Sequence, residues 1–309
     1  MTRTGALIGR SSNPNMLDNI KPARHKPVLL HESIDGLNLE DGKVFVDATF
    51  GAGGHTKEVK GKFPGVRTIS IDQDPGVGAD ITGNFRGIDT LLPDTQPDAI
   101  LLDIGISSDQ IDSSGRGFSF QKDEPLDMRM GETKLTAADI LNSWDEPAIE
   151  LILRGFGEER FSKQIAKAIV EKRSSFAKAS QDKKTKAFQT TTDLVETILE
   201  VKPRHFRDKI HPATKTFQAL RIAVNGELDA LEQGLEKSFD KLKVGGRLAV
   251  ISFHSLEDRI VKNFFRDRAT ENKAKLITKK PITPSDEEIK ENPRSRSAKL
   301  RILEKICEE

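Results

Sequence analysis

The sequence predicts an α/β fold in which an open, mostly parallel sheet is interrupted by a helical segment. Residues 43–55, KVFVDATFGAGGH, place a buried strand directly before a glycine turn that leads into a helix. Residues 98–105 and 246–254 are further continuous apolar strands. Between these two strands, over residues 115–210, the alternation of strands and helices stops. We therefore expect a sheet domain with an all-helical domain inserted into it.

The amino-acid composition excludes several classes of protein. With 309 residues and 36% hydrophobic content, the chain can bury a substantial core. Its net charge is only +1, so any surface for nucleic acid must be a local patch. Cys307 is the only cysteine, which excludes a disulfide framework and is typical of the reducing cytoplasm. The six histidines show no ligand spacing, so we expect no metal site. No apolar run is long enough for a membrane span. The sequence is compatible with a monomer and with a homodimer.

The predicted domains follow from these patterns. Residues 1–24 are polar and are expected to form a disordered basic tail. The sheet domain is expected to comprise residues 25–114 and 211–309, with the substrate-recognition domain inserted at 115–210. Near its start, the apolar run in HKPVLLHES predicts a helix that begins before Gly36.

The glycine turn is the first candidate ligand site. Gly51, Gly53 and Gly54 leave the backbone room to approach a ligand, and N–H groups at the start of the next helix attract a polar or anionic group. Thr56 stands where a dinucleotide-binding fingerprint would have its last glycine. This substitution disfavours a nicotinamide-dependent dehydrogenase.

The second predicted strand, residues 67–71, points to the kind of cofactor. It ends in Asp72, 19 residues after Gly53, about where an acidic side chain accepts hydrogen bonds from a ribose diol. A cofactor with one ribose and no pyrophosphate fits best, and S-adenosylmethionine is such a cofactor. Only residues 75–80 separate this strand from the β-like stretch at Ile81, too few for a crossover helix. We expect a compact loop there and a short or irregular third strand.

The strand at residues 98–105 contributes a third acidic strand end, Asp103. In open α/β sheets ligands lie at the carboxyl ends of the strands, so Asp47, Asp72 and Asp103 should meet on one rim. The alternative is that these carboxylates only cap helices in exposed loops.

The inserted segment opens with two loop-like runs that carry large apolar side chains, RGFSF and PLDMRM. Helix-period stretches follow at residues 137–144, 147–154, 159–173 and 193–201. Residues 174–189 are rich in Lys, Ser and Ala, and they form either a solvated basic loop or a contact with RNA.

After the strand at 246–254, residues 255–258 are expected to cap a helix that begins near Arg259. His254 is either a hydrogen-bonded structural residue or a residue that contacts the substrate. Two β-like runs, 274–278 and 298–306, predict hairpin strands added to the parallel sheet. Four basic residues lie close together near the second run and could bind several phosphates: Arg294, Arg296, Lys299 and Arg301.

The chain resembles the ribosomal RNA small subunit methyltransferase H family. The matching runs are HKPVLLHE, DATFGAGGH, IDQDP, LLDIGISSDQID, RGFSF, PLDMRM, FQALRI with VNxEL, VISFHSLEDRIVK and NPRSRS. They occur in the family's order from His25 to Arg301, which is nearly the whole chain.

The resemblance implies an S-adenosylmethionine-dependent enzyme that methylates N4 of a cytidine in the decoding region of 16S rRNA in the small ribosomal subunit. It also implies a class I (Rossmann-like) methyltransferase sheet. Asp72 would contact the ribose, Phe85 the adenine and Asp103 the methionine amine, and the further cofactor contacts would be Gly53, Gly54, His55 and Gln110. Independently of the resemblance, the basic cluster makes Arg294 and Arg296 the expected RNA contacts, with His254 as a further candidate. The chain departs from the family at Asp109, where proline is usual, and in the missing crossover helix before Phe85.

The chemistry can be reasoned independently. The sulfonium carbon is electrophilic, so the enzyme mainly has to hold the acceptor nitrogen in line behind it, away from water. The amine proton becomes acidic only as the new bond forms, so Asp103, Ser107 or Ser108 could accept or relay it without a strong base. Methylation at cytosine C5 would need a thiolate in the pocket, which Cys307 is not placed to supply. A stacked base would use Phe118, Phe120 or Phe253.

An alternative is a non-catalytic ribosome assembly factor that binds S-adenosylmethionine and RNA without turnover. The short loop before Phe85 is the feature that favours it, because an altered adenine pocket would weaken cofactor binding.

Overall fold

The computed structural model describes residues 26–106, 111, 114–131, 133–179, 186–202 and 210–307. The predicted tail, residues 1–24, lies outside this range, as do residues 180–185 of the predicted basic loop 174–189. The loop prediction is wrong for residues 174–179, which form the end of helix α7 (Ser162–Ala179). Among the described helices, none combines the length and the apolar character that crossing a membrane requires.

Seven strands form one sheet in the order β3-β2-β1-β4-β5-β7-β6, which confirms the predicted α/β class. Strands β1 to β5 pair in parallel, and β7 runs antiparallel between β5 and β6, so the C-terminal pair has the predicted antiparallel arrangement. The strands are β1 (Val44–Asp47), β2 (Arg67–Asp72), β3 (Ile81–Thr82), β4 (Ala99–Asp103), β5 (Arg247–Ser252), β6 (Ala274–Leu276) and β7 (Lys299–Lys305).

Helices cover both faces of the sheet, because the central strands are apolar on both sides. One face packs around Phe45, Leu101 and Ile251, together with Ile34 of α1 and Val59 of α2. The opposite face packs against helices that include α10 and α11. The helices of this unit are α1 (Leu30–Gly36), α2 (Gly54–Lys62), α3 (Ile88–Leu91), α10 (Glu227–Lys241), α11 (Ser255–Thr270) and α12 (Asp286–Glu291).

The third strand is short, as predicted. Strand β3 has two residues and pairs with Ile71 and Asp72 at the edge of the sheet. Two 3₁₀ turns, Pro75–Val77 before it and Phe85–Gly87 after it, stand where longer helices are usual. The loop is compact because Ser70 donates its backbone N–H and its hydroxyl to the Asp80 carboxylate, at 2.8 and 2.7 Å.

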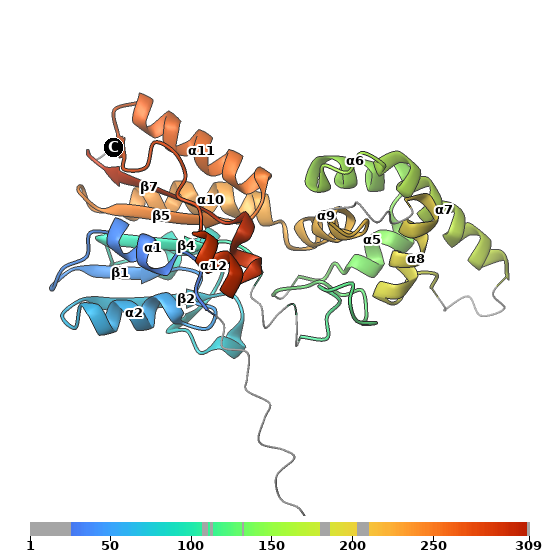
Figure 1. Ribbon diagram of the computed structural model, residues 1–309, viewed down its shortest axis with the longest axis horizontal. Coiled ribbons are helices and arrows are strands. Elements are labelled where there is room, and N and C mark those ends of the chain that lie inside the picture. The colour runs from blue at the N-terminus through green and yellow to red at the C-terminus, as the bar shows by residue number, and fades with distance from the viewer. Residues whose placement is uncertain are drawn as a thin grey trace, which may run out of the picture.

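A second unit lies beside the sheet and consists of helices that share one apolar cluster (Figure 1). They are α5 (Ala137–Ser143), α6 (Glu146–Gly157), α7 (Ser162–Ala179), α8 (Thr191–Val201) and α9 (Thr214–Asn225). Each helix-period stretch of the inserted segment is therefore helical.

Helix α9 packs with this helical unit, although the sequence analysis placed its residues in the sheet domain. Phe217, Leu220 and Val224 recur at helical spacing and are buried in the helical cluster, against α6. Helix α9 lies on the side of the helical unit that faces the sheet (Figure 1). We propose that the inserted domain extends to Asn225, after which Gly226, at φ 58°, turns the chain into α10.

Candidate active site

A cavity of about 430 Å³ opens at the carboxyl ends of the parallel strands. Its walls come from the glycine turn after β1, the ends of β2 and β4, the loop after β5 and helix α9. The inserted segment before α5 contributes two phenylalanines. The cavity therefore lies where the sheet unit and the helical unit meet, the usual place for a ligand in this kind of sheet.

The glycine turn has the geometry that the sequence predicts. Gly51 and Gly53 have φ values of 52° and 72°, in the left-handed region that favours glycine. A Cβ on Gly53 would lie 2.6 Å from the ring of Phe50, and one on Gly54 would overlap Pro27. Gly51, Gly54 and His55 line the cavity, so the N-terminus of α2 is directed to it, whereas Gly53 shapes the turn without lining the cavity.

Asp72, at the end of β2, lines the cavity and also fixes the glycine turn. Its Oδ2 accepts a hydrogen bond from the Gly51 N–H at 2.8 Å, and its Oδ1 accepts one from the Asp74 N–H at 2.9 Å. A carboxylate can accept about four hydrogen bonds, so both oxygens retain a lone pair for a ligand hydroxyl. The predicted ribose contact is compatible with these bonds.

Asp47 ends β1 but does not line the cavity. It pairs with Ser70 and Leu101, so Asp72 and Asp103 extend two residues further along their strands. This register leaves Asp47 only 1% exposed, where its Oδ2 accepts the hydroxyl of Thr56 at 2.7 Å. Burial raises the pKa of Asp47 to about 6. All three acidic residues end parallel strands on the same side of the sheet, but Asp47 is set back from the rim and only Asp72 and Asp103 line the cavity.

Asp103 fits a positively charged ligand group. Its side chain is 18% exposed, and its buried Oδ1 has no hydrogen-bond partner among the described residues. Burial, with smaller contributions from the charges of Asp47 and Glu257, raises its pKa to about 8. A buried carboxylate without a donor is unfavourable in isolation and is stabilised by a cation. The amine of S-adenosylmethionine is such a cation, so the residues present fit this cofactor.

His55 lies beside Asp103, with Nδ1 3.9 Å from Oδ2 of that carboxylate. Its Nε2 is 3.2 Å from the carbonyl oxygen of Val28, which connects the start of α2 to the chain before α1.

Phe85 lines the cavity although no crossover helix precedes it. Its ring packs on Gly234 of α10, where a Cβ would overlap it. The short loop after β2 therefore still places an aromatic ring in the pocket.

Aromatic rings form the part of the wall nearest the helical unit. Phe118 and Phe120 line the cavity, and Phe120 stacks on His211 with ring centroids 4.5 Å apart. Phe253, after β5, lies against Gly105, where a Cβ would be 3.1 Å from the ring. All three phenylalanines expected to be available for base stacking therefore lie at the cavity.

The basic cluster near the C-terminus divides into two parts. Arg294 lines the cavity, and Arg296 is exposed in the same 3₁₀ turn, Pro293–Ser297. Lys299 and Arg301 instead donate to the Asp258 carboxylate, at 2.9 and 2.7 Å. Residues two apart on β7 face the same side of the sheet, which here is the side of α11. The four residues therefore do not all face one way, which the prediction of a single phosphate-binding cluster required.

His254 caps a helix that begins earlier than expected. Helix α11 starts at Ser255, not near Arg259, because His254 and Glu257 form a capping box. His254 lines the cavity.

The predicted site residues Ser107, Ser108 and Gln110 lie outside the residues that the structure describes. The same holds for Asp109, where the family usually has proline.

Sequence reasoning missed three ionisable residues at or beside the cavity: Arg221, which lines it, and Glu227 and Glu257, which contact the lining residues Arg221 and His254. Arg221 lines the cavity and donates two hydrogen bonds to the Glu227 carboxylate, both at 2.9 Å. The HSLE run, with its acidic residue three positions after the cap, was the available signal for Glu257. Arg221 and Glu227 stand in the FQALRI and VNxEL runs, but nothing in those runs showed that the two residues pair across the turn between two helices.

Comparison with known proteins places the chain in a family. The sequence profile described as the MraW methylase family matches residues 22–306. A protein of Synechococcus elongatus, named ribosomal RNA small subunit methyltransferase H, is 44% identical over 98% of this chain and 100% of its own length. A protein of Persephonella marina with the same name is also 44% identical, over 91% and 99% of the two chains.

A crystal structure of an rRNA methylase from Streptococcus thermophilus aligns with 90% of this chain and 96% of its own, at 13% identity and a TM-score of 0.39. A TM-score this low does not establish a shared fold. The sequence matches, in contrast, cover nearly the whole chain. The chain therefore belongs to the MraW methylase family, whose cofactor is S-adenosylmethionine.

Proposed function

We propose that this protein methylates N4 of a cytidine in the decoding region of 16S rRNA. The observation that carries the proposal is that one cavity combines a fitting site for S-adenosylmethionine with a wall of aromatic rings. The relatives' name, ribosomal RNA small subunit methyltransferase H, supports RNA of the small ribosomal subunit as the substrate.

Each part of the cofactor has a partner in this proposal. The Asp72 carboxylate accepts the ribose hydroxyls, and Phe85 packs against the adenine. The Asp103 carboxylate receives the methionine amine, and the backbone around Gly54 and His55 lies beside the methionine part. S-adenosylmethionine supplies the methyl group as an electrophilic sulfonium carbon.

The aromatic wall receives the target base. A cytidine in a duplex cannot reach a cavity at the end of strands, so the target must be unpaired or extruded from its neighbours. Phe118, Phe120 and Phe253 offer ring faces on which the base can stack, and stacking contributes about 1–3 kcal/mol per base. Such stacking would hold the N4 amine in one plane and so restrict its approach to the methyl group.

Orientation, more than acid–base chemistry, would set the rate. The lone pair of N4 is delocalised into the cytosine ring, and a hydrogen-bond acceptor near its protons helps to localise it. Asp103 is the described carboxylate at the cavity with an unpartnered oxygen, and a bound cation would favour its ionised, accepting form. Ser107 and Ser108 follow it directly in the sequence and are the other candidates to accept or relay the proton.

The surrounding RNA would be held by the inserted helical domain and the basic 3₁₀ turn. Arg294 and Arg296 are the proposed phosphate contacts, since Lys299 and Arg301 are committed to Asp258. His254 lies at the cavity with both ring nitrogens close to Glu257, Nδ1 3.4 Å from its backbone nitrogen and Nε2 3.0 Å from its Oε1, so it would contact RNA through the face of its ring.

The test is nucleoside mass spectrometry of 16S rRNA after the purified protein acts on small ribosomal subunits from a strain that lacks it. The proposal predicts N4-methylcytidine at one decoding-region position, dependent on S-adenosylmethionine. A C5-methylated product would contradict the site assignment. If no nucleoside changes while S-adenosylmethionine still binds, the protein is a non-catalytic assembly factor.

An Asp72→Asn variant separates cofactor binding from a general loss of structure. Asparagine retains an oxygen that can accept the Gly51 N–H but loses the charge that strengthens bonds from the ribose hydroxyls. We expect calorimetry to show S-adenosylmethionine binding weakened by about 1.5–3 kcal/mol. Without cofactor, the free energy of unfolding should fall by only about 1 kcal/mol, because the bond from the Asp74 N–H is lost. Unchanged affinity would remove Asp72 from the cofactor site.

A further inference from the structure

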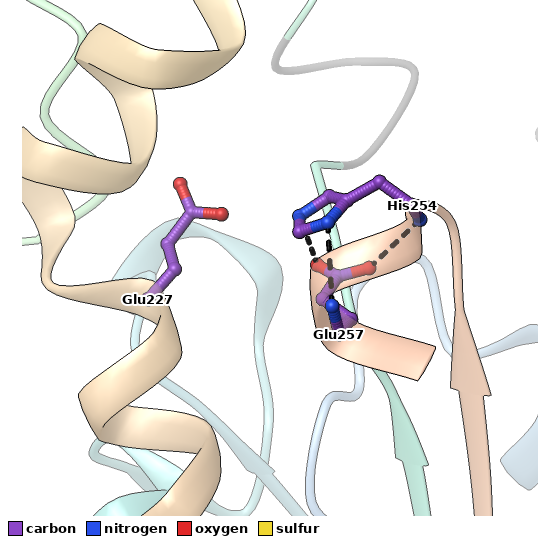
Figure 2. A group of neighbouring side chains, drawn as sticks. All are labelled: Glu227, His254 and Glu257. Carbon is purple, nitrogen blue, oxygen red and sulfur yellow. Dashed lines mark hydrogen bonds and ion pairs between the residues drawn. The ribbon is translucent and has the colours of Figure 1, made fainter. Parts of the chain in front are cut away.

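Three ionisable side chains converge beside the cavity, apart from the residues that fit the cofactor. They are Glu227 on α10, His254 at the cap of α11 and Glu257 in its first turn (Figure 2). Each offers one ligand atom, and these atoms all lie within 4.8 Å of one another. We refer to these three residues as the Glu–His–Glu cluster. Because Glu227 is 27 residues before His254, only the tertiary structure brings them together.

Glu257 is buried with one carboxylate oxygen unused. Its side chain is 1% exposed, and its Oε2 accepts the backbone N–H groups of Phe253 and His254, at 2.8 and 3.2 Å. Its Oε1 has no hydrogen-bond partner in the part of the chain that the structure describes, and the same holds for Nε2 of His254. These two atoms are nevertheless only 3.0 Å apart.

A ring N–H pointing at an oxygen 3.0 Å away would form a hydrogen bond, so here the nitrogen and the oxygen are not aimed at each other. Figure 2 shows the imidazole above the Glu257 carboxylate, with the Glu227 carboxylate facing the ring from α10. A ring nitrogen and a carboxylate oxygen at this separation, with a ligand atom of Glu227 within 4.8 Å of both, have the spacing of neighbouring ligands on one ion.

The charges of the surroundings also favour a bound cation. Arg221 neutralises Glu227 through two hydrogen bonds at 2.9 Å, whereas no lysine or arginine of the described residues forms a salt bridge with the buried Glu257, whose ion-pair partner is His254 at 3.0 Å. Asp103 adds a further carboxylate nearby, since its interaction with Glu257 is repulsive. An unpaired buried carboxylate is costly unless a cation or a proton balances it.

We propose that Glu227, His254 and Glu257 bind a divalent first-row transition metal ion at the wall of the cavity. Two carboxylates and one imidazole form a mixed oxygen and nitrogen ligand set that suits Zn²⁺, Mn²⁺ or Fe²⁺. Three protein ligands leave at least one position for water or a substrate oxygen. Arg221 acts as the outer partner that orients Glu227, in the way that ligating carboxylates are commonly held by a second hydrogen bond.

Metal binding changes one contact of the helix cap. With Nε2 on the metal, the ring proton resides on Nδ1, which then no longer accepts the Glu257 N–H. That bond is 3.4 Å long, the longest of the three in the cap, and the two bonds to Oε2 of Glu257 persist. The metal would then join α10 to α11 beside the aromatic wall, so that its loss loosens the cavity.

The experiment titrates ZnCl₂ into chelator-treated full-length protein by calorimetry, without S-adenosylmethionine or RNA. We expect one Zn²⁺ per chain with a dissociation constant in the micromolar range or below. His254→Asn removes the imidazole and keeps a good capping side chain, while Glu257→Gln keeps the acceptor for the cap but loses the ligand charge. Each change should weaken binding at least tenfold.

Glu232→Gln, at an exposed position on the same helix as Glu227, is the matched control and should bind Zn²⁺ like the wild type. The proposal fails if the wild type binds no stoichiometric Zn²⁺. It also fails if both ligand variants bind Zn²⁺ as tightly as the control. Neither outcome depends on methylation, so the proposed function is tested separately.

Discussion

The hydroxyl of Thr56 donates a 2.7 Å hydrogen bond to the carboxylate of Asp47, which is almost fully buried at the end of β1. This bond joins the first turn of α2 to the central strand and so holds the glycine turn between them. The residue that breaks the dinucleotide fingerprint therefore has a structural role. It replaces close glycine packing with a hydrogen bond to a carboxylate.

Replacing Thr56 with valine should lower the free energy of unfolding by about 1–3 kcal/mol, because the buried carboxylate loses its best donor. Its remaining bond, from the Thr49 N–H, is 3.4 Å long. Urea denaturation of the protein without cofactor measures the loss. Thr82→Val, at an exposed position on strand β3, is the matched control and should change stability by less than about 0.5 kcal/mol. Equal effects of the two changes would contradict the role of the bond.

The stability of the protein without cofactor should fall as the pH rises from about 4 to about 8. Burial raises the pKa of Asp103 from 3.8 to about 8, so in this range the folded state binds more protons than the unfolded state. The free energy of unfolding then decreases with rising pH. Denaturation at several pH values should show this slope in the wild type, and Asp103→Asn should reduce it.

The same carboxyl makes cofactor binding release a proton. A cationic amine beside Asp103 favours its ionised form, so a carboxyl that is protonated near neutral pH must ionise when S-adenosylmethionine binds. Calorimetry in buffers of different ionisation enthalpy should detect proton release in the wild type and less of it in Asp103→Asn. A binding heat that is independent of the buffer in the wild type would contradict this linkage.

Gly234→Ala should weaken S-adenosylmethionine binding about tenfold, because the new methyl group would overlap the ring of Phe85 and displace it from the cavity. In a helix interior, glycine to alanine otherwise stabilises by about 1 kcal/mol. Gly155→Ala in α6, where nothing lies within 4 Å of the new methyl group, is the matched control. It should stabilise the protein and leave cofactor affinity unchanged. If both variants bind the cofactor normally, Phe85 does not contact it.

Charge reversal at the basic turn should weaken RNA binding in a salt-dependent way. Arg294→Glu combined with Arg296→Glu should reduce affinity for small ribosomal subunits about tenfold or more. The slope of log K against log salt should become shallower by roughly 0.7–0.9 for each phosphate that the variant no longer neutralises. Filter binding at several salt concentrations provides both values. Lys275→Glu, on the distant edge strand β6, should behave like the wild type, and an unchanged slope in the double variant would exclude the turn from the RNA interface.

Much of the sheet could be predicted from local patterns. The strands at Val44–Asp47, Ala99–Asp103 and Arg247–Ser252 are continuous apolar runs followed by glycine or polar residues, and the short chain before Ile81 left no room for a helix. Helix α9 was assigned to the wrong unit because its apolar stripe shows that it packs, but not against which neighbour. That choice depends on contacts with α6 that are distant in sequence.

The candidate site was also predictable only in part. Asp72, Phe85 and Asp103 lie at the cavity as predicted. The sequence did not show that Lys299 and Arg301 are separated from Arg294 and Arg296, because a cluster of charges in sequence does not reveal that a buried Asp258 pairs with two of them.

The sequence by itself determined where strands end, where glycine is required and which carboxylates stand at strand ends, because these depend on neighbours within a few residues. The tertiary structure alone decided that Asp47 is set back from the rim, since strand register places it two residues behind Asp72 and Asp103. It alone also brought Glu227 against His254 and Glu257. Burial, and the pKa values and ion binding that follow from it, arise from groups that only the folded chain brings together.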